Sequence, residues 1–372
     1  AGDRARGRPR LGAADAAAQE RRAMKGVWLH LALLLGALGF AYQTWTRPAA
    51  SEAGGQPRES EREVIVWEVA AESIKSIDLM GEKKLVRLER RTEGGEAWLW
   101  GTVEREKPAP KKTEETPESL SKVEEGATTR KAFLVGEAGD KLVASLSTLR
   151  ALRALGKLDA ARKQELGLDA PKETLRVISG AVTHALRLGG KVYGGSDRYA
   201  EYVKTGEAFV VGGDALRDLD AAESRLVERE VHRFKPDAVK AMAVKRGDRA
   251  RALVRGGVDA KALFWADAGK PDAKDETAGN WVAKLDRLKV TDYVEDQAAD
   301  AAESVAPEPV VRVEYAGAGG ESLGFLELQK TPSEKDGKFD YQARTEHTRG
   351  LVKVSQFLGE QVEQDLDAVL AK

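Results

Sequence analysis

Two parts of the chain repeat the same residue pattern at a constant distance. The stretch "LSTLRAL" from Leu146 is answered by "VAKLDRL" 136 positions later, and "APKETLRV" from Ala170 is answered by "APEPVVRV" at the same distance. Upstream, "IKSIDLMGEKKLVRLER" from Ile74 resembles "VKAMAVKRGDRARALVR" at a distance of 165. These distances are too long for a solenoid repeat. We therefore predict two copies of one unit, over residues 63–228 and 229–372.

Short runs of alternating apolar and polar residues fill the first copy. Such alternation is typical of half-buried antiparallel strands, because successive side chains of a strand point to opposite faces. The predicted strands cover residues 64–69, 74–80, 84–90, 97–103, 173–179, 183–188, 199–204 and 207–212. In the second copy, "VVRVEY" and "LGFLEL" flank a glycine-rich stretch at 317–322, which we interpret as a hairpin turn.

Three segments show helical periodicity. The first predicts a helix with a leucine stripe at Leu142, Leu146, Leu149, Leu152 and Leu155. "GDALRDLDAAESRL" from Gly213 predicts a second helix. The third closes the second copy and has an apolar face made of Val354, Phe357, Leu358, Val362, Leu366 and Val369. The predicted fold class is α+β, with two tandem copies of an antiparallel-sheet-plus-helix unit.

An apolar run between Trp28 and Trp45 precedes both copies. As an α-helix it would be about 26 Å long, close to the ~30 Å of a bilayer's hydrocarbon core. The tryptophans match the aromatic belt of a spanning helix, and the basic residues before the run place the N-terminus in the cytoplasm. We predict an N-terminal transmembrane helix, a signal anchor, over residues 24–46. Its membrane residues are Trp28, Leu31, Leu33, Leu34, Leu35, Leu38, Phe40 and Trp45.

A cleaved signal peptide is the alternative to this anchor. Small residues at Gly39 and Ala41 could form a weak cleavage site, whereas Tyr42, Trp45 and the lack of a clean A-x-A motif favour retention. Both interpretations carry the body of the protein across the membrane. The predicted location is the inner (cytoplasmic) membrane, as a single-pass protein with an extracytoplasmic, periplasmic body.

Three further segments carry no predicted fold of their own. Residues 1–23 are rich in Arg, Ala and Gly and precede Met24, so we interpret them as a disordered or mis-assigned extension. Residues 47–62 form a polar linker. A Pro/Lys/Glu-rich insertion at 104–129 predicts a mobile loop inside the first copy.

Composition excludes several classes of function. The chain of 372 residues has a formal net charge of −1, which disfavours nucleic acid as a partner because phosphate binding needs a basic excess. It contains no cysteine, which removes disulfides, thiol nucleophiles and thiolate zinc sites.

The residues that most often carry catalysis form no recognisable pattern. His30, His184, His232 and His347 lie far apart, and none has a metal-ligand spacing. We place His184 at a strand surface or edge, and we interpret His232 with Glu230 as a cross-strand polar pair. No nucleophile elbow or P-loop occurs. The sequence therefore predicts no catalytic residue, no metal and no cofactor.

Two pairs of aromatic residues lie on predicted strands. Trp98 and Trp100 share one face of a strand and are predicted core residues. Tyr199 and Tyr202 are an odd step apart, so we place them on opposite faces. A single aromatic recognition surface is therefore not expected there.

The turn Gly167-Leu168-Asp169-Ala170-Pro171 follows the leucine-rich helix and tryptophan-containing strands. Together with the N-terminal membrane helix, these motifs resemble a bacterial membrane-anchored family of unknown function, DUF4340. The resemblance extends from about Met24 to the C-terminus and is best between residues 140 and 220. The second copy departs from it, because Ala306-Pro307 lacks the preceding Gly-Leu. The resemblance implies a link with ABC-type transport or gliding-motility systems.

Our leading hypothesis is a non-enzymatic, membrane-anchored envelope protein that acts as a binding or scaffolding module within a membrane complex. Two alternatives remain open. One is a carbohydrate-active or other hydrolase that uses Asp and Glu residues in a cleft between the copies. The other is a ligand-binding protein that uses the same cleft and is released if the signal is cleaved; an apolar pocket with convergent polar groups there would favour it.

Retention of the anchor predicts the mature N-terminus of the membrane-bound protein. Purified from its own membranes with a C-terminal tag, the protein should carry its N-terminus upstream of Trp28, since no peptidase removes the apolar run. Mass spectrometry of the intact protein measures this end. A mature N-terminus close to Ala41 would instead establish a cleaved signal peptide.

Overall fold

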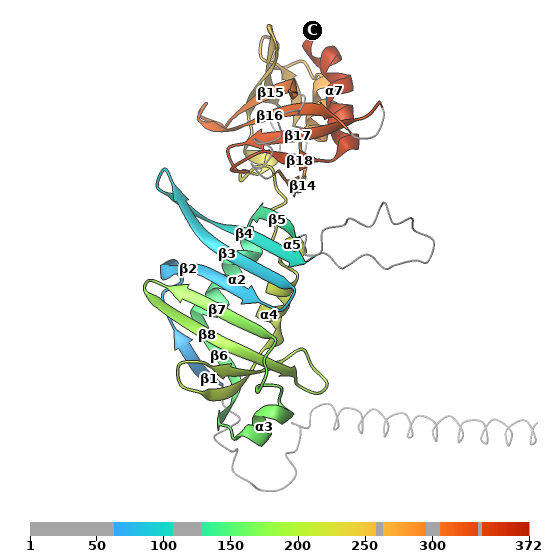
Figure 1. Ribbon diagram of the computed structural model, residues 1–372. Helices are drawn as coiled ribbons and strands as arrows, with labels where there is room; N and C mark the ends of the chain where they lie inside the picture. The colour runs from blue at the N-terminus through green and yellow to red at the C-terminus, as the bar shows by residue number, and fades with distance from the viewer. Residues whose placement is uncertain (1–62, 107–127, 258–262, 295–305, 334–336, 372) are drawn as a thin grey trace, which may run out of the picture. The chain divides into compact units, whose positions relative to one another are not determined.

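The computed structural model describes residues 63–106, 128–257, 263–294, 306–333 and 337–371 (Figure 1). The predicted extension, anchor and linker lie outside the described residues, and so do residues 107–127 of the insertion. Within the part that is described, no helix combines the length and apolar character needed to cross a bilayer.

The first sheet is antiparallel and has ten strands in the order β1-β6-β10-β9-β8-β7-β2-β3-β4-β5. Its strands are β1 (Val64–Glu68), β2 (Ile74–Met80), β3 (Lys84–Glu93), β4 (Glu96–Glu106), β5 (Thr128–Leu134), β6 (Thr148–Lys157), β7 (Glu173–Ser179), β8 (Val182–Lys191), β9 (Arg198–Tyr202) and β10 (Glu207–Val211). The accompanying helices are η2 (Ala71–Ser73), α2 (Glu137–Ser147), α3 (Ala160–Glu165), α4 (Gly213–Asp220) and α5 (Ala222–Arg225).

The second sheet is also antiparallel and has eight strands in the order β13-β12-β11-β15-β16-β17-β18-β14. Its strands are β11 (Ala241–Arg246), β12 (Arg249–Gly256), β13 (Phe264–Asp267), β14 (Val290–Tyr293), β15 (Glu308–Ala316), β16 (Ser322–Pro332), β17 (Phe339–Thr345) and β18 (Val352–Val354). Its helices are η4 (Pro236–Ala238), α6 (Glu276–Leu285) and α7 (Gln356–Leu370).

The two sheets share one connectivity. Read along each sheet, β6-β10-β9-β8-β7-β2-β3-β4 corresponds strand by strand to β14-β18-β17-β16-β15-β11-β12-β13. Single bridges at Glu230–Lys289 and Ala266–Lys274 take the places of β1 and β5. The α+β class is confirmed in these residues, and the shared connectivity is consistent with an internal duplication.

Most predicted strands of the first copy are present within one to three residues of their expected ends. The expected hairpin turn lies between β15 and β16. The predicted loop 104–129 was too wide, because Glu104–Glu106 continue β4 and Thr128–Thr129 begin β5. Strand β5 itself was missed, since its sequence "TTRKAFL" follows a low-complexity tract and does not alternate.

The predicted leucine helix is wrong beyond Ser147. Helix α2 ends there, and residues 148–157 form β6, which pairs with β1 on one side and β10 on the other. Pairing at both edges outweighs the local helical periodicity. Leu152 is consequently exposed on the strand rather than on an apolar helix face.

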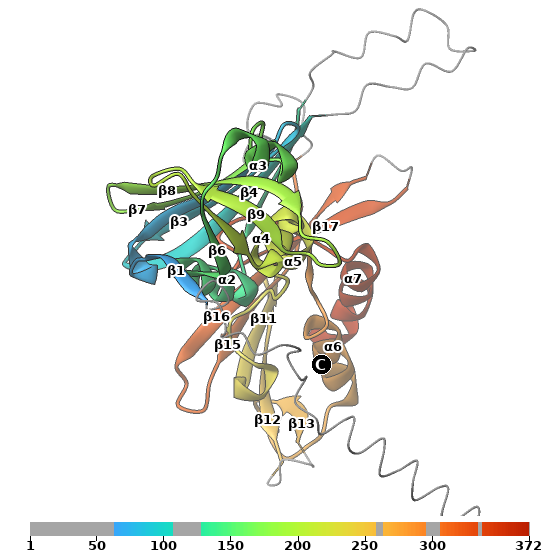
Figure 2. The same cartoon turned by 90° about the horizontal axis from the view of Figure 1, so that it is seen from below.

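A core lies between each sheet and the helices on one of its faces (Figures 1 and 2). In the first sheet, the Trp67 indole on β1 donates a 2.8 Å hydrogen bond to the carbonyl of Leu146 at the end of α2. In the second, the Trp281 indole on α6 donates a 2.9 Å bond to the carbonyl of Val362 on α7. These two indole N–H groups thus each find an acceptor, as is usual for buried polar groups.

The C-terminal helix α7 is confirmed, with one correction to its face. Val362, Leu366 and Val369 are completely buried, as expected. Phe357 is 64% exposed, because it lies in the first turn at a position beyond the edge of the core. Val354 belongs to β18 and not to the helix.

Residues 226–234, which we call the connecting segment, hydrogen-bond to both sheets. The amide of Glu228 donates to the carbonyl of Leu134, and the amide of Gly136 donates to the carbonyl of Leu226. On the other side, the amide of Val290 in β14 donates to the carbonyl of Arg229. The same few residues therefore extend an edge of each sheet.

Replacing the buried indole of α6 should destabilise the protein strongly. We expect Trp281→Ala to lower the free energy of unfolding by about 3–5 kcal/mol, because it leaves a cavity between α6 and α7 and removes the hydrogen bond to the Val362 carbonyl. Phe357→Ala on the exposed turn of α7 is the control, with an expected change below about 0.5 kcal/mol. Urea denaturation measures both, and similar losses would contradict this assignment of the core.

Candidate functional site

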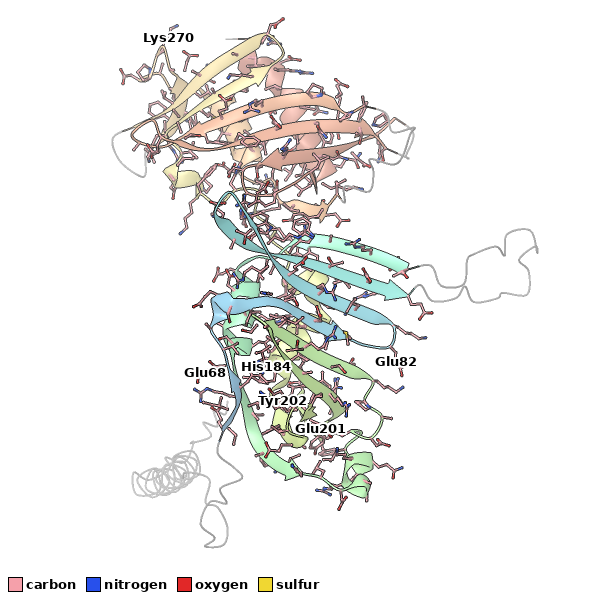
Figure 3. All side chains as sticks on the ribbon, turned by 60° about the vertical axis from the view of Figure 1, so that its left-hand side comes forward. Glu68, Glu82, His184, Glu201, Tyr202 and Lys270 are labelled. Atoms are coloured by element: carbon pink, nitrogen blue, oxygen red, sulfur yellow. The ribbon has the colours of Figure 1, made fainter. Side chains whose placement is uncertain are left out.

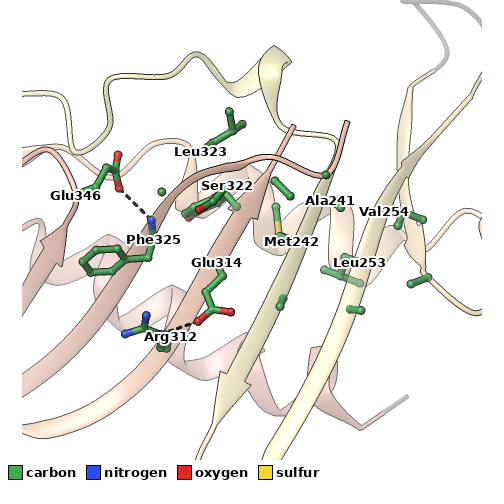
Figure 4. A pocket seen from close by; sticks show the side chains of 17 residues that line it. Ala241, Met242, Leu253, Val254, Arg312, Glu314, Ser322, Leu323, Phe325 and Glu346 are labelled. Carbon is green, nitrogen blue, oxygen red and sulfur yellow. Dashed lines mark hydrogen bonds and ion pairs between the residues drawn. The ribbon is translucent and has the colours of Figure 1, made fainter. Parts of the chain in front are cut away.

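A hollow of about 820 Å³ lies on the face of the second sheet opposite α6 and α7 (Figure 4). Its floor comes from β12, β11 and β15. Ala243 pairs with Ala252 on one side and Glu314 on the other, and Ala241 pairs with Val254 and Ala316. The intervening residues Met242, Val244 and Leu253 point into the core and are buried. Small side chains thus cover three neighbouring strands.

Strand β16 forms one wall of this hollow. Leu323 and Phe325 line it, and both are half-buried. The backbone amide of Phe325 donates a 3.0 Å hydrogen bond to the Glu346 carboxylate, which also lines the hollow (Figure 4). Phe325 is therefore fixed by a side chain that comes from the turn after β17.

The charged groups beside the floor neutralise one another. Glu314 accepts hydrogen bonds from Lys245 and from Arg312, each at 3.1 Å. These two cations lower the pKa of Glu314. Arg312 also pairs with Glu327 on β16 and lies over the Phe325 ring. Lys245, Arg312, Glu314 and Glu327 thus form a charge-balanced group beside the apolar floor, and the remaining carboxylate of the lining, Glu346, accepts the Phe325 amide.

The corresponding face of the first sheet is charged. Asp78 on β2 pairs in register with Arg87 on β3 and Arg176 on β7, where the second sheet has Ala243 between Ala252 and Glu314. Its carboxylate lies 2.9 Å from Arg87 and 3.4 Å from Arg176. The two arginines cover Asp78, which is 1% exposed. The same strand positions therefore carry an ionic cluster in one sheet and an alanine floor in the other.

A smaller pocket of about 300 Å³ lies where the two sheets meet. Its lining includes four carboxylates and two histidines: Glu137, Asp140, Glu228, Glu230, His232 and His347. A glycoside hydrolase needs one carboxyl group with a raised pKa as general acid. A hydrogen bond from His347 instead lowers the pKa of Glu228, and one from Lys141 lowers the pKa of Glu137. The pocket gives the hydrolase alternative no specific support.

The histidines of this pocket pair with carboxylates of other elements. His232 lies 3.1 Å from Glu346, and His347 lies 3.5 Å from Glu228. Glu230 pairs with Lys289, so the predicted association of His232 with Glu230 is wrong. Among the described residues, no group of three or more His, Asp or Glu could hold a metal ion.

His184 lies in the core of the first sheet and not at a surface (Figure 3). Its Nδ1 is 2.8 Å from the Tyr202 hydroxyl, and its ring lies against that of Trp67, with centroids 5.2 Å apart. Burial lowers the pKa of His184 and raises that of Tyr202. His184 is buried because Trp67 from β1 and Tyr202 from β9 pack against its ring, which sequence periodicity could not show.

The predicted core tryptophans lie at the junction instead. Trp98 and Trp100 are both only half-buried; Arg349 lies 4.4 Å over Trp98, and Trp100 meets Tyr293 edge-on at 5.9 Å. Their face of β4 therefore contacts the second sheet. Tyr199 and Tyr202 do occupy opposite faces, as expected, because they pack into different clusters.

Sequence analysis missed the alanine floor of the hollow. The signal was present as alternation of alanine with larger residues, Met242 and Val244 in "AMAVKR" and Arg251 and Leu253 in "RARALVR". Alanines on one strand do not indicate a site. Only the order of the strands shows that alanines of several strands form one continuous surface. The eight predicted anchor residues lie outside the described residues.

Residues 136–309 match a family model described as Domain of unknown function (DUF4340). The match begins at the start of α2, crosses the connecting segment and ends in β15. It includes the stretch in which the resemblance noted from the sequence was best. No curated protein and no solved structure matches the chain. The family description assigns no activity.

The Glu228–His347 contact predicts a stability difference that depends on pH. Since the pKa of Glu228 is lowered from its ordinary value of 4.5, its ionised form stabilises the folded state above that pH. The contribution should disappear as the pH falls below 4.5 and through the lowered pKa. We expect Glu228→Gln to be less stable than the parent at pH 6, with the difference shrinking toward pH 3. Urea denaturation across this range tests it, and a constant difference would contradict the pairing.

Proposed function

We propose that this protein is a non-enzymatic, membrane-anchored envelope protein that acts as a binding module. The supporting observation is the hollow on the second sheet, set against the charged face at the same positions of the first. The first sheet carries Asp78 and Arg87 at the positions where the second carries Ala243 and Ala252. Solubility alone does not explain alanines at these positions of an outer sheet face. Contiguous exposed apolar surface commonly marks a site of interaction.

The occupant that this surface suits is an uncharged apolar face of a partner protein. Glu314, Lys245 and Arg312 at the border are already paired within the sheet, and Glu346 is held by His232 and the Phe325 amide. An occupant with a net charge would have to break such a pair or lose water without compensation, which costs free energy. An apolar occupant gains about 25 cal/mol for each Å² that is removed from water. The alanines let it approach the sheet closely.

We further propose that the partner is a component of a membrane complex, of the ABC-type transport or motility class. The predicted anchor over residues 24–46 would hold the body near such a complex. The matched family itself supplies no partner, so this step rests on the resemblance and on the predicted anchor.

A ligand-binding protein is the second candidate, and one observation favours it. The volume of the hollow, about 820 Å³, falls within the roughly 300–1,000 Å³ typical of small-molecule sites. In this case the occupant would be a neutral apolar molecule. The paired charges at the border of the hollow favour an uncharged occupant, whether it is a partner protein or a small molecule.

Site-specific crosslinking in native membranes separates these functions. Because the chain has no cysteine, Val254→Cys places a single thiol at the hollow, and Glu89→Cys places one on the equivalent strand of the first sheet. With a thiol-linked photocrosslinker, we expect one reproducible membrane-protein adduct from position 254 and none from 89. Adding Ala243→Asp should abolish that adduct.

Adducts of equal yield from both positions, or none from position 254, would contradict a protein partner at the hollow. If position 254 forms no protein adduct but becomes protected from labelling by a neutral apolar compound extracted from the same membranes, the ligand-binding candidate replaces the scaffold. Mass spectrometry identifies the species in each case.

A further inference from the structure

Glu346 lies where the hollow and the connecting segment meet. One oxygen of its carboxylate, Oε1, is 3.1 Å from Nδ1 of His232 in the connecting segment. The other, Oε2, accepts the 3.0 Å hydrogen bond from the amide of Phe325 in the wall of the hollow. A single carboxylate therefore holds both elements.

The backbone at Gly324 makes room for this carboxylate. Gly324 has φ +152°, and a Cβ atom built there would lie 2.3 Å from atoms of the Glu346 carboxylate. Only glycine allows such a close approach together with that conformation. The wall of the hollow is thus shaped around Glu346.

The imidazole of His232 is fixed on its other sides by rings. It stacks on Phe234 with centroids 4.4 Å apart and meets Tyr315 edge-on at 4.8 Å. Tyr315 is the register partner of Gly324 across β15 and β16. A shift of the connecting segment would therefore be transmitted to Glu346 through a ring that has little freedom of its own.

The turn that carries Glu346 also contacts the first sheet. His347 pairs with Glu228, and Arg349 pairs with Glu96 and covers the ring of Trp98 on β4. Three side chains of one turn, Glu346, His347 and Arg349, thus contact the wall of the hollow, the connecting segment and the other sheet.

We propose that Glu346 couples the hollow to the junction of the two sheets. An occupant that displaces Phe325 moves the Glu346 carboxylate. This weakens the contact between Glu346 and His232 and so loosens the connecting segment. Conversely, movement of that segment loosens the wall. The occupant itself rests on the proposed function, but the coupling is a property of the free protein. Because coupling free energies are reciprocal, a perturbation at either end must be felt at the other.

Hydrogen–deuterium exchange of the free, full-length protein tests the coupling in both directions. His232→Phe keeps a ring between Phe234 and Tyr315 but removes the bond to Glu346. We expect amide exchange in residues 322–328, which include the Phe325 amide, to speed up at least tenfold. Lys289→Met, which breaks the ion pair with Glu230 of the connecting segment and leaves Glu346 untouched, is the matched control and should leave this peptide unchanged.

The reciprocal variant is Gly324→Ala, whose methyl group expels the Glu346 carboxylate. We expect faster exchange in residues 226–234. Gly350→Ala adds a methyl group to open space near the same turn and should have no such effect. Circular dichroism confirms that each variant remains folded. Unchanged exchange at the distant end in both test variants, or equal acceleration in the controls, would overturn the coupling.

Binding of the neutral apolar fluorophore N-phenyl-1-naphthylamine then separates the coupling from the proposed function. We expect its dissociation constant to rise about fivefold or more in His232→Phe, within the usual range of coupling between sites. If the parent protein does not bind this probe, the hollow fails as a site for small apolar ligands, and the exchange experiment still decides the coupling. If the parent binds the probe, equal affinity in parent and His232→Phe would contradict the coupling.

Discussion

The backbone hydrogen bonds of the connecting segment are the constraint on which the arrangement of the described residues depends. A polypeptide strand can bond on two edges, and residues 226–231 use one edge for Leu134 and Gly136 and the other for Val290. Each of these bonds contributes only about 1 kcal/mol. Their effect is mainly geometric, because they bring β4, with its two tryptophans, against the turn after β17.

The two sheets share one connectivity but differ in the residues of their outer faces. Their buried faces are alike, with apolar residues and one tryptophan held by a carbonyl acceptor. Their outer faces differ, because that face is not constrained by packing against helices. In the first sheet Asp78 is enclosed by two arginines, and a buried carboxylate of this kind must keep its partners. In the second, alanines leave a floor that an uncharged surface can approach closely.

The proposed binding function and the proposed coupling both follow from this difference. The hollow lies beside Phe325, Phe325 is held by Glu346, and Glu346 is held by the connecting segment. An occupant at the hollow would thereby act on the contacts that join the sheets. The enzymatic alternative has no such chain of contacts behind it, and three carboxylates of the junction pocket, Glu137, Glu228 and Glu230, are paired with a lysine or a histidine.

Local periodicity was enough to predict the strands with clear alternation and the C-terminal helix, and the repeated residue pattern predicted two similar units. Local sequence could not show that residues 148–157 form a strand, that His184 is buried or that Ala243 lies on an open floor. These depend on which strands lie side by side: β1 and β10 pair with residues 148–157, Trp67 of β1 packs against His184, and β12 and β15 flank Ala243. Side-chain pattern indicates which face a residue takes, whereas strand order determines what that face meets.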